Sequence, residues 1–595
     1  MRTPHILKVS KRNERVYRAI WFDTETRLDR VARDTIEHWL NFGWGCYREL
    51  NRHGNWSTPE WYRFETIAEF WNWVEKHSKN KSKLWLFCHN SNFDLPVLDT
   101  FRTLPRREWT LKTAIIDGPP TILQYRKDTS LLTIIDTLNF WRVPLAEIGQ
   151  HVGLPKLDMP TMDAPREQWD AYGRRDVEII MEACIAWWEW LVTYDMGGFA
   201  PTLAAQSMRT FRHKYMADDI LIDCNERALE IARESYHGGR CECFWIGKQN
   251  GEFYLLDVNS MYPWVMRTYP MPIKLACVVQ HSTVADLYTW IEQYSLIARC
   301  KINVNEPIVP VVINNKLCFP TGRFDACITT PEILWILEHG AIERVGEVVL
   351  YDQAYAFTDF VTDLYNCRLE AEKHGDTAQS HFFKMLLNSF YGKWAQRGMN
   401  WEKIADTKDL ATERWVEICY ETQEVTAYRQ FGGIIQQKST HGESTNSHPA
   451  IASHITAYAR MTLWLMIERA GPENVLYVDT DSLLVTHVGL ERLTDLIKLA
   501  DLGALKVEGV YNHVEIYGCK DYVFGTKTKI KGIRKKAALI APGVYEQERW
   551  SSLRGMLRDA SLNRPTTRMV RKYLRRQYDK GTVLESGRIV PLHYF

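Results

Sequence analysis

The hydrophobic residues in the first third of the chain fall in short runs that stop at acidic or amide residues. Three runs rich in β-branched, aromatic and aliphatic residues predict strands at Val16–Phe22 (VYRAIWF), Lys83–Cys88 (KLWLFC) and Ser130–Asp136 (SLLTIID). The first run stops at Asp23, and the second leads directly into His89–Asp94 (HNSNFD). Each predicted strand therefore ends beside a carboxylate.

A helical period follows these strands. After Pro165, the residues Tyr172, Asp176 and Ile179 recur at spacings of three to four positions and so share one side of a helix. Strands with acidic ends that lead into a helix predict an α/β unit of about 200 residues. In the rest of the chain, the pattern predicts a strand at Phe253–Asp257 and a hairpin at Tyr477–Val485. It predicts helices at Phe360–Glu372, His381–Trp394 and Pro449–Ala470, and a polar loop at Gln436–His448.

The composition is that of an ordinary globular protein, with 45% hydrophobic and 25% charged residues over 595 positions. It excludes a disordered chain, a collagen-like repeat and a disulfide scaffold, and the length predicts several domains. No apolar run is long enough to cross a bilayer, and the N-terminus lacks the apolar segment of a secretory leader. The 13 cysteines are scattered without a CxxC pair, which predicts reduced thiols in a cytoplasmic protein with no membrane partner.

The net charge of +1 hides an uneven distribution. From Lys527 to Phe595 there are 17 Lys and Arg against five acidic residues, a net charge of +12 that leaves −11 for the residues before them. Such a basic segment is able to bind phosphates, although on charge alone a solvated surface is the more common explanation. The aromatic clusters at 71–73 (WNW) and 187–190 (WWEW) favour core packing over base stacking.

Three acids of the second half point to chemistry. Asp257, Asp479 and Asp481 fall at predicted strand ends, where neighbouring buried carboxylates repel one another unless divalent cations bind them. Two-metal phosphoryl transfer requires this arrangement. Solvent-exposed turn acids are the alternative, but Lys384 and Asn388 on a following helix add groups suited to a triphosphate.

Seven motifs in order resemble those of the family B DNA polymerases. The second half contains DVNSMYP at 257–263, KMLLNSFYGK at 384–393, YVDTDS at 477–482 and KDY at 520–522. The first third contains DTET at 23–26, HNSNFD at 89–94 and YGRRD at 172–176, which resemble the motifs of the proofreading exonuclease. The resemblance implies an α/β plus α+β multidomain protein, with an RNase H-like exonuclease domain followed by a right-hand palm, fingers and thumb.

For the polymerase site, the resemblance implies that Asp257 and Asp481 bind two Mg²⁺ ions, with Asp479 and Val258 beside them and Mn²⁺ as a possible substitute. It assigns Tyr262 to the position beneath the incoming sugar. The triphosphate and base contacts that it implies are Arg368, Lys384, Asn388 and Tyr391. Ser380 stands where some relatives carry a second lysine.

For the exonuclease site, the resemblance implies a second pair of metal ions held by four carboxylates. These acids are Asp23, Glu25, Asp94 and Asp176, assisted by Tyr172 and Lys156. The single-strand contacts that it implies are Thr26, His89, Asn90, Phe93, Thr137 and Leu138. An ordinary packed histidine is an equal alternative for His89, and a turn-capping role is the better interpretation of Asp158.

Other motifs imply contacts to DNA and a particular branch of the family. Lys520 and Tyr522 resemble contacts to the primer terminus. Tyr236, Gly238 and Gly239 of YHGGR resemble the connecting loop of the protein-primed branch. ITAYAR at 455–460 resembles one of the helices of that branch. Intervals of 127 residues between Asp257 and Lys384 and of 87 between Gly392 and Asp479 fit the two insertions of that branch. The basic C-terminal segment then falls where the thumb would hold duplex DNA.

The resemblance also suggests a division of the chain. We expect an exonuclease domain at 1–200 and a polymerase domain at 201–595, with the palm at about 235–264 and 450–530, the first insertion at 265–350, the fingers at 355–395, the second insertion at 396–448 and the thumb at 531–595.

The expected partners are template and primer DNA, dNTPs and a priming terminal protein, with the chain acting as a monomer in the cytoplasm of a bacterial host. Synthesis from an ordinary nucleic-acid primer, or without a primer, remains an alternative. A non-catalytic DNA-binding scaffold is a remote alternative, because it predicts the loss of a metal carboxylate.

Overall fold

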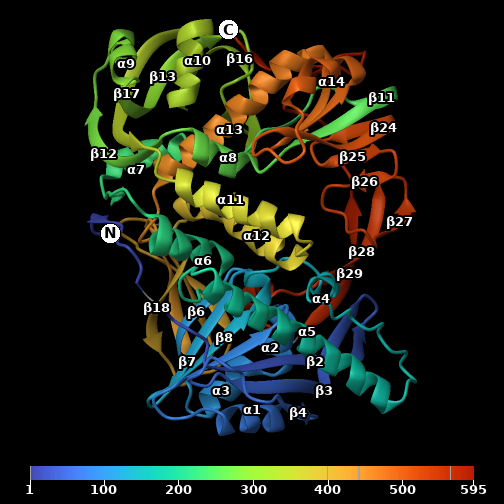
Figure 1. Cartoon of the computed structure of the whole chain (residues 1–595). Helices are drawn as coiled ribbons and strands as arrows, with labels where there is room; N and C mark the ends of the chain where they lie inside the picture. The colour runs from blue at the N-terminus through green and yellow to red at the C-terminus, as the bar shows by residue number, and fades with distance from the viewer. Residues whose placement is uncertain (1, 12, 399, 440–441, 563–564) are drawn as a thin grey trace.

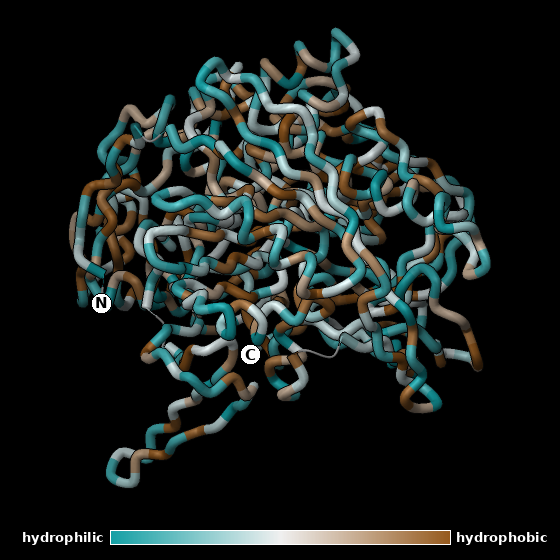
Figure 2. Tube along the Cα trace, turned by 90° about the horizontal axis from the view of Figure 1, so that it is seen from below, coloured by the Kyte–Doolittle hydropathy of each residue, from teal (hydrophilic) through white to brown (hydrophobic). Residues whose placement is uncertain are grey.

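The protein is described from a computed structural model that covers residues 2–11, 13–398, 400–439, 442–562 and 565–595. Figure 1 shows the N-terminal strands at one end of the molecule, a helical pair in the middle, and further sheets at the other end. In Figure 2 the hydrophobic segments run mainly through the interior of the trace, whereas outer turns are mainly hydrophilic. None of the helices in the described residues is long and apolar enough to span a membrane.

The N-terminal unit is built on a sheet of ten strands in the described chain. Its centre is parallel, with β2 beside β5 and β5 beside β8, and antiparallel strands extend it on both sides. In sheet order the strands are β27 (Ala538–Ala541), β28 (Val544–Trp550), β29 (Thr566–Tyr573), β3 (Thr35–Glu49), β2 (Arg18–Ala32), β5 (Lys83–Cys88), β8 (Ser130–Asp136), β7 (Thr121–Lys127) and β6 (Thr110–Ile116), with β4 (Glu60–Phe64) beside β3. The sheet therefore joins strands from both ends of the sequence, and Figure 1 shows the red C-terminal strands beside the blue ones.

Two of the three strands predicted in this unit are confirmed with their bounds, and one is longer than expected. The runs Lys83–Cys88 and Ser130–Asp136 form β5 and β8 as predicted. The first strand does not stop at Asp23, because β2 continues to Ala32 and pairs with β3 along its length. Cross-strand pairing thus carries the chain through the acidic positions that were expected to end it.

Helices cover the sheet and define its core. The long α5 (Arg166–Thr193) confirms the predicted helix and packs against β2 and β3. Trp71, Trp73, Trp187 and Trp190 are all buried, which confirms core packing for these clusters. The other helices of this part are α1 (Ile67–Lys76), α2 (Ser91–Val97), α3 (Thr100–Arg106), α4 (Leu145–His151) and α6 (Leu203–Thr210).

A second sheet carries the acids of the other predicted site. Its strands in order are β10 (Cys241–Cys243), β22 (Val475–Asp479), β23 (Ser482–Thr486), β11 (Gly247–Val258), β24 (Leu505–Gly518), β25 (Asp521–Phe524) and β26 (Lys527–Lys529). The predicted hairpin at Tyr477–Val485 is the β22–β23 pair, and the predicted strand at Phe253–Asp257 lies within β11. This sheet packs with α13 (Pro449–Ala470), which has the predicted bounds and is buried nearly all round, as expected for a central helix.

Two further sheets occupy the intervals between the motifs. The first interval supplies four strands of a five-stranded sheet, in the order β12 (Met271–Val279), β17 (Ala341–Ala354), β13 (Tyr294–Val304) and β16 (Thr321–Thr329), and the C-terminal β32 (His593–Tyr594) joins it in parallel beside β16. The second forms a four-stranded sheet in the order β18 (Trp401–Asp406), β21 (Ile434–Lys438), β20 (Val425–Phe431) and β19 (Glu413–Ile418). The polar loop predicted from Gln436 is therefore partly wrong, because β21 pairing extends to Lys438; Thr440 and His441 of that loop lie outside the described residues.

The two helices predicted between these sheets form an adjacent pair. They are α11 (Thr358–Lys373) and α12 (Thr377–Trp394), and both extend beyond their predicted bounds. The remaining α-helices are α7 (Glu226–Glu234), α8 (Met261–Thr268), α9 (Val284–Trp290), α10 (Thr330–His339), α14 (His487–Leu493) and α15 (Leu553–Arg558). Three short strand pairs complete the described chain: β1 (His5–Ile6) with β9 (Leu221–Ile222), β14 (Val311–Ile313) with β15 (Lys316–Cys318), and β30 (Gly581–Val583) with β31 (Ile589–Pro591).

Candidate active sites

Four carboxylates of the N-terminal unit converge from three elements. Asp23 and Glu25 on β2 and Asp176 on α5 each bring an oxygen to within 4.8 Å of the others. Asp94 on α2 accepts hydrogen bonds from the backbone N–H of Thr24 at 3.2 Å and from its hydroxyl at 2.7 Å, which draws α2 onto β2. We call these four acids the N-terminal cluster.

Burial makes the charged form of this cluster unfavourable. It raises the pKa of Glu25 to about 7, with repulsion from Asp176 adding to the effect. Burial also raises the pKa of Asp94 to about 7, against the opposing hydrogen bonds from Thr24. The pKa of Asp23 is raised well above its ordinary value by burial and by the neighbouring carboxylates.

One lysine partly compensates this charge. Lys156 forms an ion pair with Asp176 and lies 4.2 Å from the ring centroid of Tyr172. The other oxygen of Asp176 is buried without a hydrogen-bond partner among the described residues. Asp158 is exposed and lies outside the group, in a segment without a helix, strand or turn.

The site fits divalent cations on this chemistry. It offers converging carboxylate oxygens of like charge, one of them unpartnered and buried, with a single lysine against four acids. Such hard oxygen donors suit Mg²⁺ or Mn²⁺. Residues Asp23, Glu25, Asp94 and Asp176 would hold the ions.

The predicted single-strand contacts lie around this cluster, and they differ in how exposed they are and in whether other residues already hold them. Phe93 and Thr26 are partly exposed and adjoin Asp94 and Glu25 in the chain. His89 uses both ring nitrogens internally, at 2.9 Å from the Thr137 hydroxyl and 3.0 Å from the Val143 carbonyl oxygen. The packed alternative is therefore favoured for His89, and Thr137 is buried with it.

Asp136, at the end of β8, organises this loop and was not predicted to have a role. Its side chain accepts hydrogen bonds from the backbone N–H groups of Asn90, Ser91 and Leu138 at 2.9–3.0 Å, and from the Ser91 hydroxyl at 2.7 Å. Asn90 adopts a left-handed conformation with φ of 77°. The third strand ending on an acid was the available signal, and the acid fixes the HNSNFD loop.

The second group of acids lies where three strands of the second sheet end. Asp257 is near the end of β11, Asp479 ends β22, and Asp481 lies in the turn to β23. The Val258 N–H donates to the Asp481 carbonyl oxygen at 2.8 Å, which ties the turn to β11. We call these acids the second cluster.

Lysines neutralise much of the second cluster. Lys506 Nζ lies 2.9 Å from an Asp257 oxygen, while Lys520 and Lys529 lie 3.2 and 3.9 Å from the oxygens of Asp479. Burial, then repulsion from Asp257, raises the pKa of Asp481 to about 6. In the described residues, three acidic oxygens converge within 4.8 Å only in the N-terminal cluster, whereas Asp257 and Asp479 are paired with lysines.

Lys506 carried no signal in the sequence. It reaches Asp257 because β11 and β24 pair with Asp257 opposite Lys506, a register that a single strand pattern does not reveal. Burial raises the pKa of Asp257, and the ion pair with Lys506 opposes this rise. The oxygens of Asp257 and Asp481 offer the same hard-donor chemistry as the N-terminal cluster, so this site also fits a divalent cation.

The predicted nucleotide-binding residues gather on the helical pair and on α8. Lys384 and Asn388 are exposed one turn apart on α12. The ring centroid of Tyr391 on α12 lies 4.4 Å from that of Tyr262 on α8. Arg368 on α11 donates weakly to the Ser260 hydroxyl at 3.4 Å, and it pairs with Glu372 at 2.9 Å.

The loop with Tyr236, Gly238 and Gly239 lies against the acidic turn. A Cβ atom on Gly239 would lie 2.8 Å from the Thr480 methyl carbon and 3.0 Å from the Tyr262 hydroxyl, so only glycine permits this approach. Arg460 donates to the carbonyl oxygen of Gly238 at 3.1 Å. The structure thus brings this loop to the second cluster.

The predicted primer contacts lie on the opposite side of Asp479. Lys520 donates its backbone N–H to the Tyr477 hydroxyl at 3.0 Å, besides its ion pair with Asp479. Tyr522 is buried to 6% exposure and stacks on Phe524 at 4.0 Å. The β24–β25 pairing therefore aims Lys520 at the acids and leaves Tyr522 mainly packed.

Sequence comparisons find similarity to DNA polymerases. A profile described as DNA polymerase type B, organellar and viral, matches residues 197–467. A DNA-directed DNA polymerase of Enterobacteria phage PRD1 is 28% identical over 540 residues, covering 88% of this chain and 86% of the relative. The chain is therefore similar to type B DNA polymerases over residues 197–467 and to a phage DNA polymerase over most of its length.

Other relatives set the extent of the likeness. A probable DNA polymerase of Neurospora intermedia is 26% identical, but the match covers 54% of this chain and only 34% of that protein. A solved structure of Phi29 DNA polymerase, complexed with primer-template DNA and incoming nucleotide substrates, has a TM-score of 0.67 at 18% identity and covers 94% of this chain and 100% of its own. The predicted fold class of exonuclease, palm, fingers and thumb is thereby confirmed.

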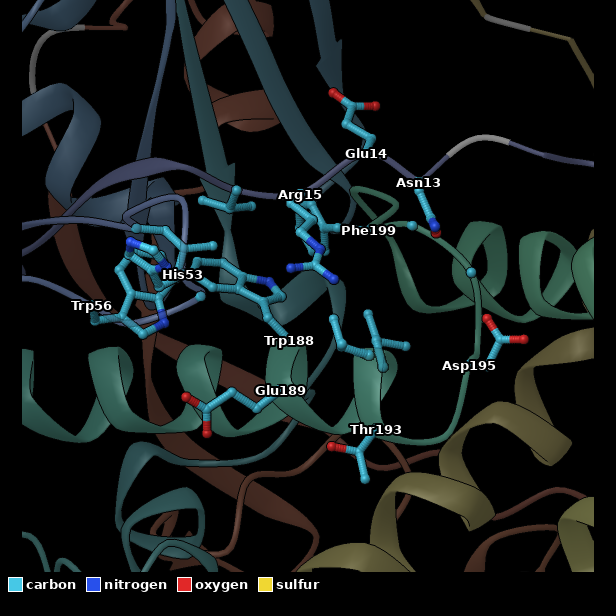
Figure 3. A pocket seen from close by; sticks show the side chains of 17 residues that line it. Asn13, Glu14, Arg15, His53, Trp56, Trp188, Glu189, Thr193, Asp195 and Phe199 are labelled. Atoms are coloured by element: carbon cyan, nitrogen blue, oxygen red, sulfur yellow. The ribbon is translucent and has the colours of Figure 1, made fainter.

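The protein also contains a cavity away from both acid clusters. It has a volume of about 580 Å³ and lies between the N-terminal segment, the loop after β3 and the end of α5. Figure 3 shows Arg15 above Trp188, with Trp56 and His53 on one side and Asp195 on the other. Residues of the two clusters do not line it.

Proposed function

We propose that the chain is a replicative DNA polymerase with a separate 3′–5′ proofreading exonuclease, each site working with two divalent ions, most suitably Mg²⁺. The observation that carries this proposal is the presence of two distinct groups of partly buried, mutually repelling carboxylates in one type B polymerase. The remote alternative, a non-catalytic scaffold, predicts the loss of a metal carboxylate. All of the acids expected from the motifs are present.

At the polymerase site we assign Asp257 and Asp481 to hold the ions, with Asp479 and the backbone of Val258 beside them. When bound, the ions would stabilise charge on the attacking and leaving oxygens of nucleotidyl transfer. Because lysines pair with Asp257 and Asp479, the side chains of Lys506 and Lys520 would have to move aside on metal binding. Their charge would then face the phosphates.

For the incoming nucleotide we assign five residues around the same site. Lys384, Asn388 and Arg368 would hold the triphosphate, since the exposed face of α12 carries the first two one turn apart. Tyr391 would lie against the nascent base pair, and Tyr262 beneath the sugar. A ring there excludes a 2′-hydroxyl, which favours dNTPs over ribonucleotides. The solved Phi29 complex, whose title includes incoming nucleotide substrates, supports dNTPs as partners.

For proofreading we assign Asp23, Glu25, Asp94 and Asp176 to the ions, with Lys156 and Tyr172 orienting the attacking water. Lys156 would keep Asp176 charged, because the ion pair opposes the effect of burial. The single strand would contact Thr26, Asn90, Phe93 and Leu138, whereas His89 and Thr137 would support the loop from within.

We also propose the division of the chain that the motifs suggest, with the exonuclease at 1–200 and the polymerase at 201–595. Tyr236, Gly238, Gly239, Lys520 and Tyr522 would then position the primer and template near the second cluster. The basic segment after Lys527 would bind duplex DNA through phosphate contacts. The Phi29 complex with primer-template DNA supports DNA as a partner.

The branch of the family is a finer proposal. We propose that synthesis begins on a hydroxyl of a terminal protein and displaces the downstream strand on a linear phage-type genome. Support comes from the two motif intervals, because each supplies four strands of a separate sheet, β12–β17–β13–β16 (joined by the C-terminal β32) and β18–β21–β20–β19. Removal of the β19–β20 hairpin is expected to reduce strand displacement on a nicked duplex more than synthesis on an open template.

Protein priming has a direct assay. Incubation with template, labelled dNTP and the protein encoded beside the polymerase gene should yield label covalently attached to that protein. The polymerase with Asp257→Ala is the control and should give no label. Label only on an oligonucleotide primer would favour the alternative of ordinary priming, and label on free dinucleotides would favour initiation without a primer.

Metal binding should depend on pH in a defined direction. The pKa values of Glu25 and Asp94 are raised to about 7 in the fold, so between about pH 4.5 and 7 the native state binds more protons than the unfolded state. Metal-free stability should therefore fall as pH rises through this range. Because Mg²⁺ binds the charged carboxylates, the rise in melting temperature on adding Mg²⁺ should be larger at pH 8 than at pH 6.

Thermal unfolding with and without MgCl₂ at both pH values measures this effect. Asp23→Asn with Glu25→Gln should shrink the difference between pH 6 and pH 8, whereas Asp29→Asn on the exposed part of β2 should leave it unchanged. An equal Mg²⁺ effect at the two pH values would contradict the assignment.

A further inference from the structure

An aromatic contact links the C-terminal strands to the N-terminal cluster. The ring of Trp550, the last residue of β28, lies 5.0 Å from that of His38 and 5.7 Å from that of Phe93. The rings of His38 and Phe93 lie 5.4 Å apart. Three segments that are far apart in the sequence therefore meet in one group of rings.

Strand pairing and polar contacts fix this group in place. β29 pairs with β3, with Thr567 opposite Ile36, and the Thr567 hydroxyl lies 2.7 Å from His38 Nε2. The backbone N–H of Leu553 donates to the side-chain oxygen of Asn92 at 3.0 Å. Leu553 and Met556 are also buried in the N-terminal core. The position of Trp550 is thus set by the same loop that carries Phe93.

This group of rings adjoins two of the acids along the chain. Phe93 directly precedes Asp94. Thr26 directly follows Glu25, and its hydroxyl oxygen lies 3.3 Å from His38 Nδ1. Trp550 is 42% exposed and Phe93 is partly exposed, so both offer ring surface to a ligand that reaches the acids.

The chemistry of the group favours bases over phosphates. His38 is only 7% exposed, and burial lowers its pKa, so it stays neutral at physiological pH. Neutral aromatic rings bind unpaired bases by stacking, with little dependence on sequence. His38 then supports Trp550 from behind, while Trp550 and Phe93 face the ligand.

We propose that Trp550 and Phe93 form a stacking surface for the unpaired bases next to the nucleotide being removed, positioned by His38. The C-terminal strands would thereby supply a binding residue to the exonuclease. This inference rests on the proposed exonuclease function. A strand melted from the duplex would pass over Trp550 before its terminal nucleotide reaches the acids.

Kinetics on substrates of different length test this role. Loss of one base–aromatic stack costs roughly 1–3 kcal/mol, or about 5- to 150-fold in affinity. Trp550→Ala should therefore raise the KM for a single-stranded oligonucleotide about tenfold or more, with kcat nearly unchanged. The p-nitrophenyl ester of thymidine 5′-monophosphate, which has no base next to the nucleotide being removed, should be degraded normally. Trp550→Phe should restore most of the affinity.

A matched control comes from the same pair of strands. Tyr573 on β29 is 69% exposed and forms no ring contact with His38 or Phe93. Tyr573→Ala should leave both the KM for the oligonucleotide and the rate on the p-nitrophenyl ester unchanged. An equal rise in KM with Tyr573→Ala, or an unchanged KM with Trp550→Ala, would overturn the stacking surface.

Fluorescence gives a readout that a structural effect would not imitate. An oligonucleotide with 2-aminopurine beside its 3′-terminal nucleotide, bound to the Asp23→Ala, Glu25→Ala protein, should be quenched by stacking. Adding Trp550→Ala should relieve the quenching, and Trp550→Phe should preserve it; undiminished quenching with Trp550→Ala would overturn the proposal. If the unmodified protein does not degrade single strands at all, the exonuclease proposal itself fails, whereas normal degradation with an unchanged KM in Trp550→Ala refutes only the stacking surface.

Discussion

Replacement of Asp257 or Asp481 by alanine is expected to lower the rate of dNTP incorporation by at least about a thousandfold. Each change removes a carboxylate from the second cluster, and a catalytic divalent ion stabilises several kcal/mol of transition-state charge, with each 1.36 kcal/mol worth tenfold in rate. Asp257→Ala also removes the carboxylate 2.9 Å from Lys506 Nζ, which leaves this lysine with its longer, 3.5 Å pair to Glu508. Single-nucleotide extension of a primed template under single-turnover conditions measures the effect.

The control variant removes one negative charge, as Asp257→Ala does, but at a position outside the second cluster. Asp495→Ala removes an exposed acid of the same part of the chain and should extend primers at the normal rate. Degradation of single strands by Asp257→Ala should also be normal, because the N-terminal cluster is untouched. Near-normal extension by either Asp257→Ala or Asp481→Ala would refute the assignment of the polymerase site.

The double variant Asp23→Ala, Glu25→Ala is expected to lose degradation of single strands by at least about a thousandfold while it extends primers normally. Two of the three acids that converge within 4.8 Å are removed, so the ions lose their main ligands. The variant should also fold well, since the acids repel one another and their pKa values are raised by burial. Release of labelled nucleotides from a 5′-labelled oligonucleotide is followed by gel electrophoresis.

Two acids at the exposed end of the same strand pair provide the comparison. The double variant Asp29→Ala, Asp34→Ala removes the same number of negative charges. Both residues lie near the turn between β2 and β3, at the end of the hairpin beyond the cluster. This variant should degrade single strands normally. Persistent degradation by Asp23→Ala, Glu25→Ala would show that the nuclease chemistry lies elsewhere.

The sequence predicts the acid-bearing elements well, because their signals are local. The apolar runs of β5 and β8 are buried on both faces of a parallel sheet centre, and the continuous apolar period of α13 matches a central helix. Motif order then predicts which acids belong together. The end of β2 was missed because it depends on pairing with β3, which holds the strand together beyond Asp23 and Glu25.

The parts that could not be predicted depend on contacts between distant segments. The ion pair of Lys506 with Asp257 needs the register of β11 on β24, and the contact of Trp550 with Phe93 needs a strand pair formed by residues more than 500 positions apart. A local pattern carries no information about such registers. Asp136 is the exception, since its place at a strand end was visible but its hydrogen bonds to the loop were not.

The shared ten-stranded sheet has a consequence for synthesis of the chain on the ribosome. β3 cannot obtain its partner β29 until residues near 570 have been made, and at about 5–20 residues per second this takes tens of seconds after the N-terminal strands emerge. During that time the edge of β3 and the core positions later filled by Leu553 and Met556 stay uncovered. Unpaired strand edges promote aggregation, so the newly made N-terminal unit is a natural client for a chaperone until the last strands arrive.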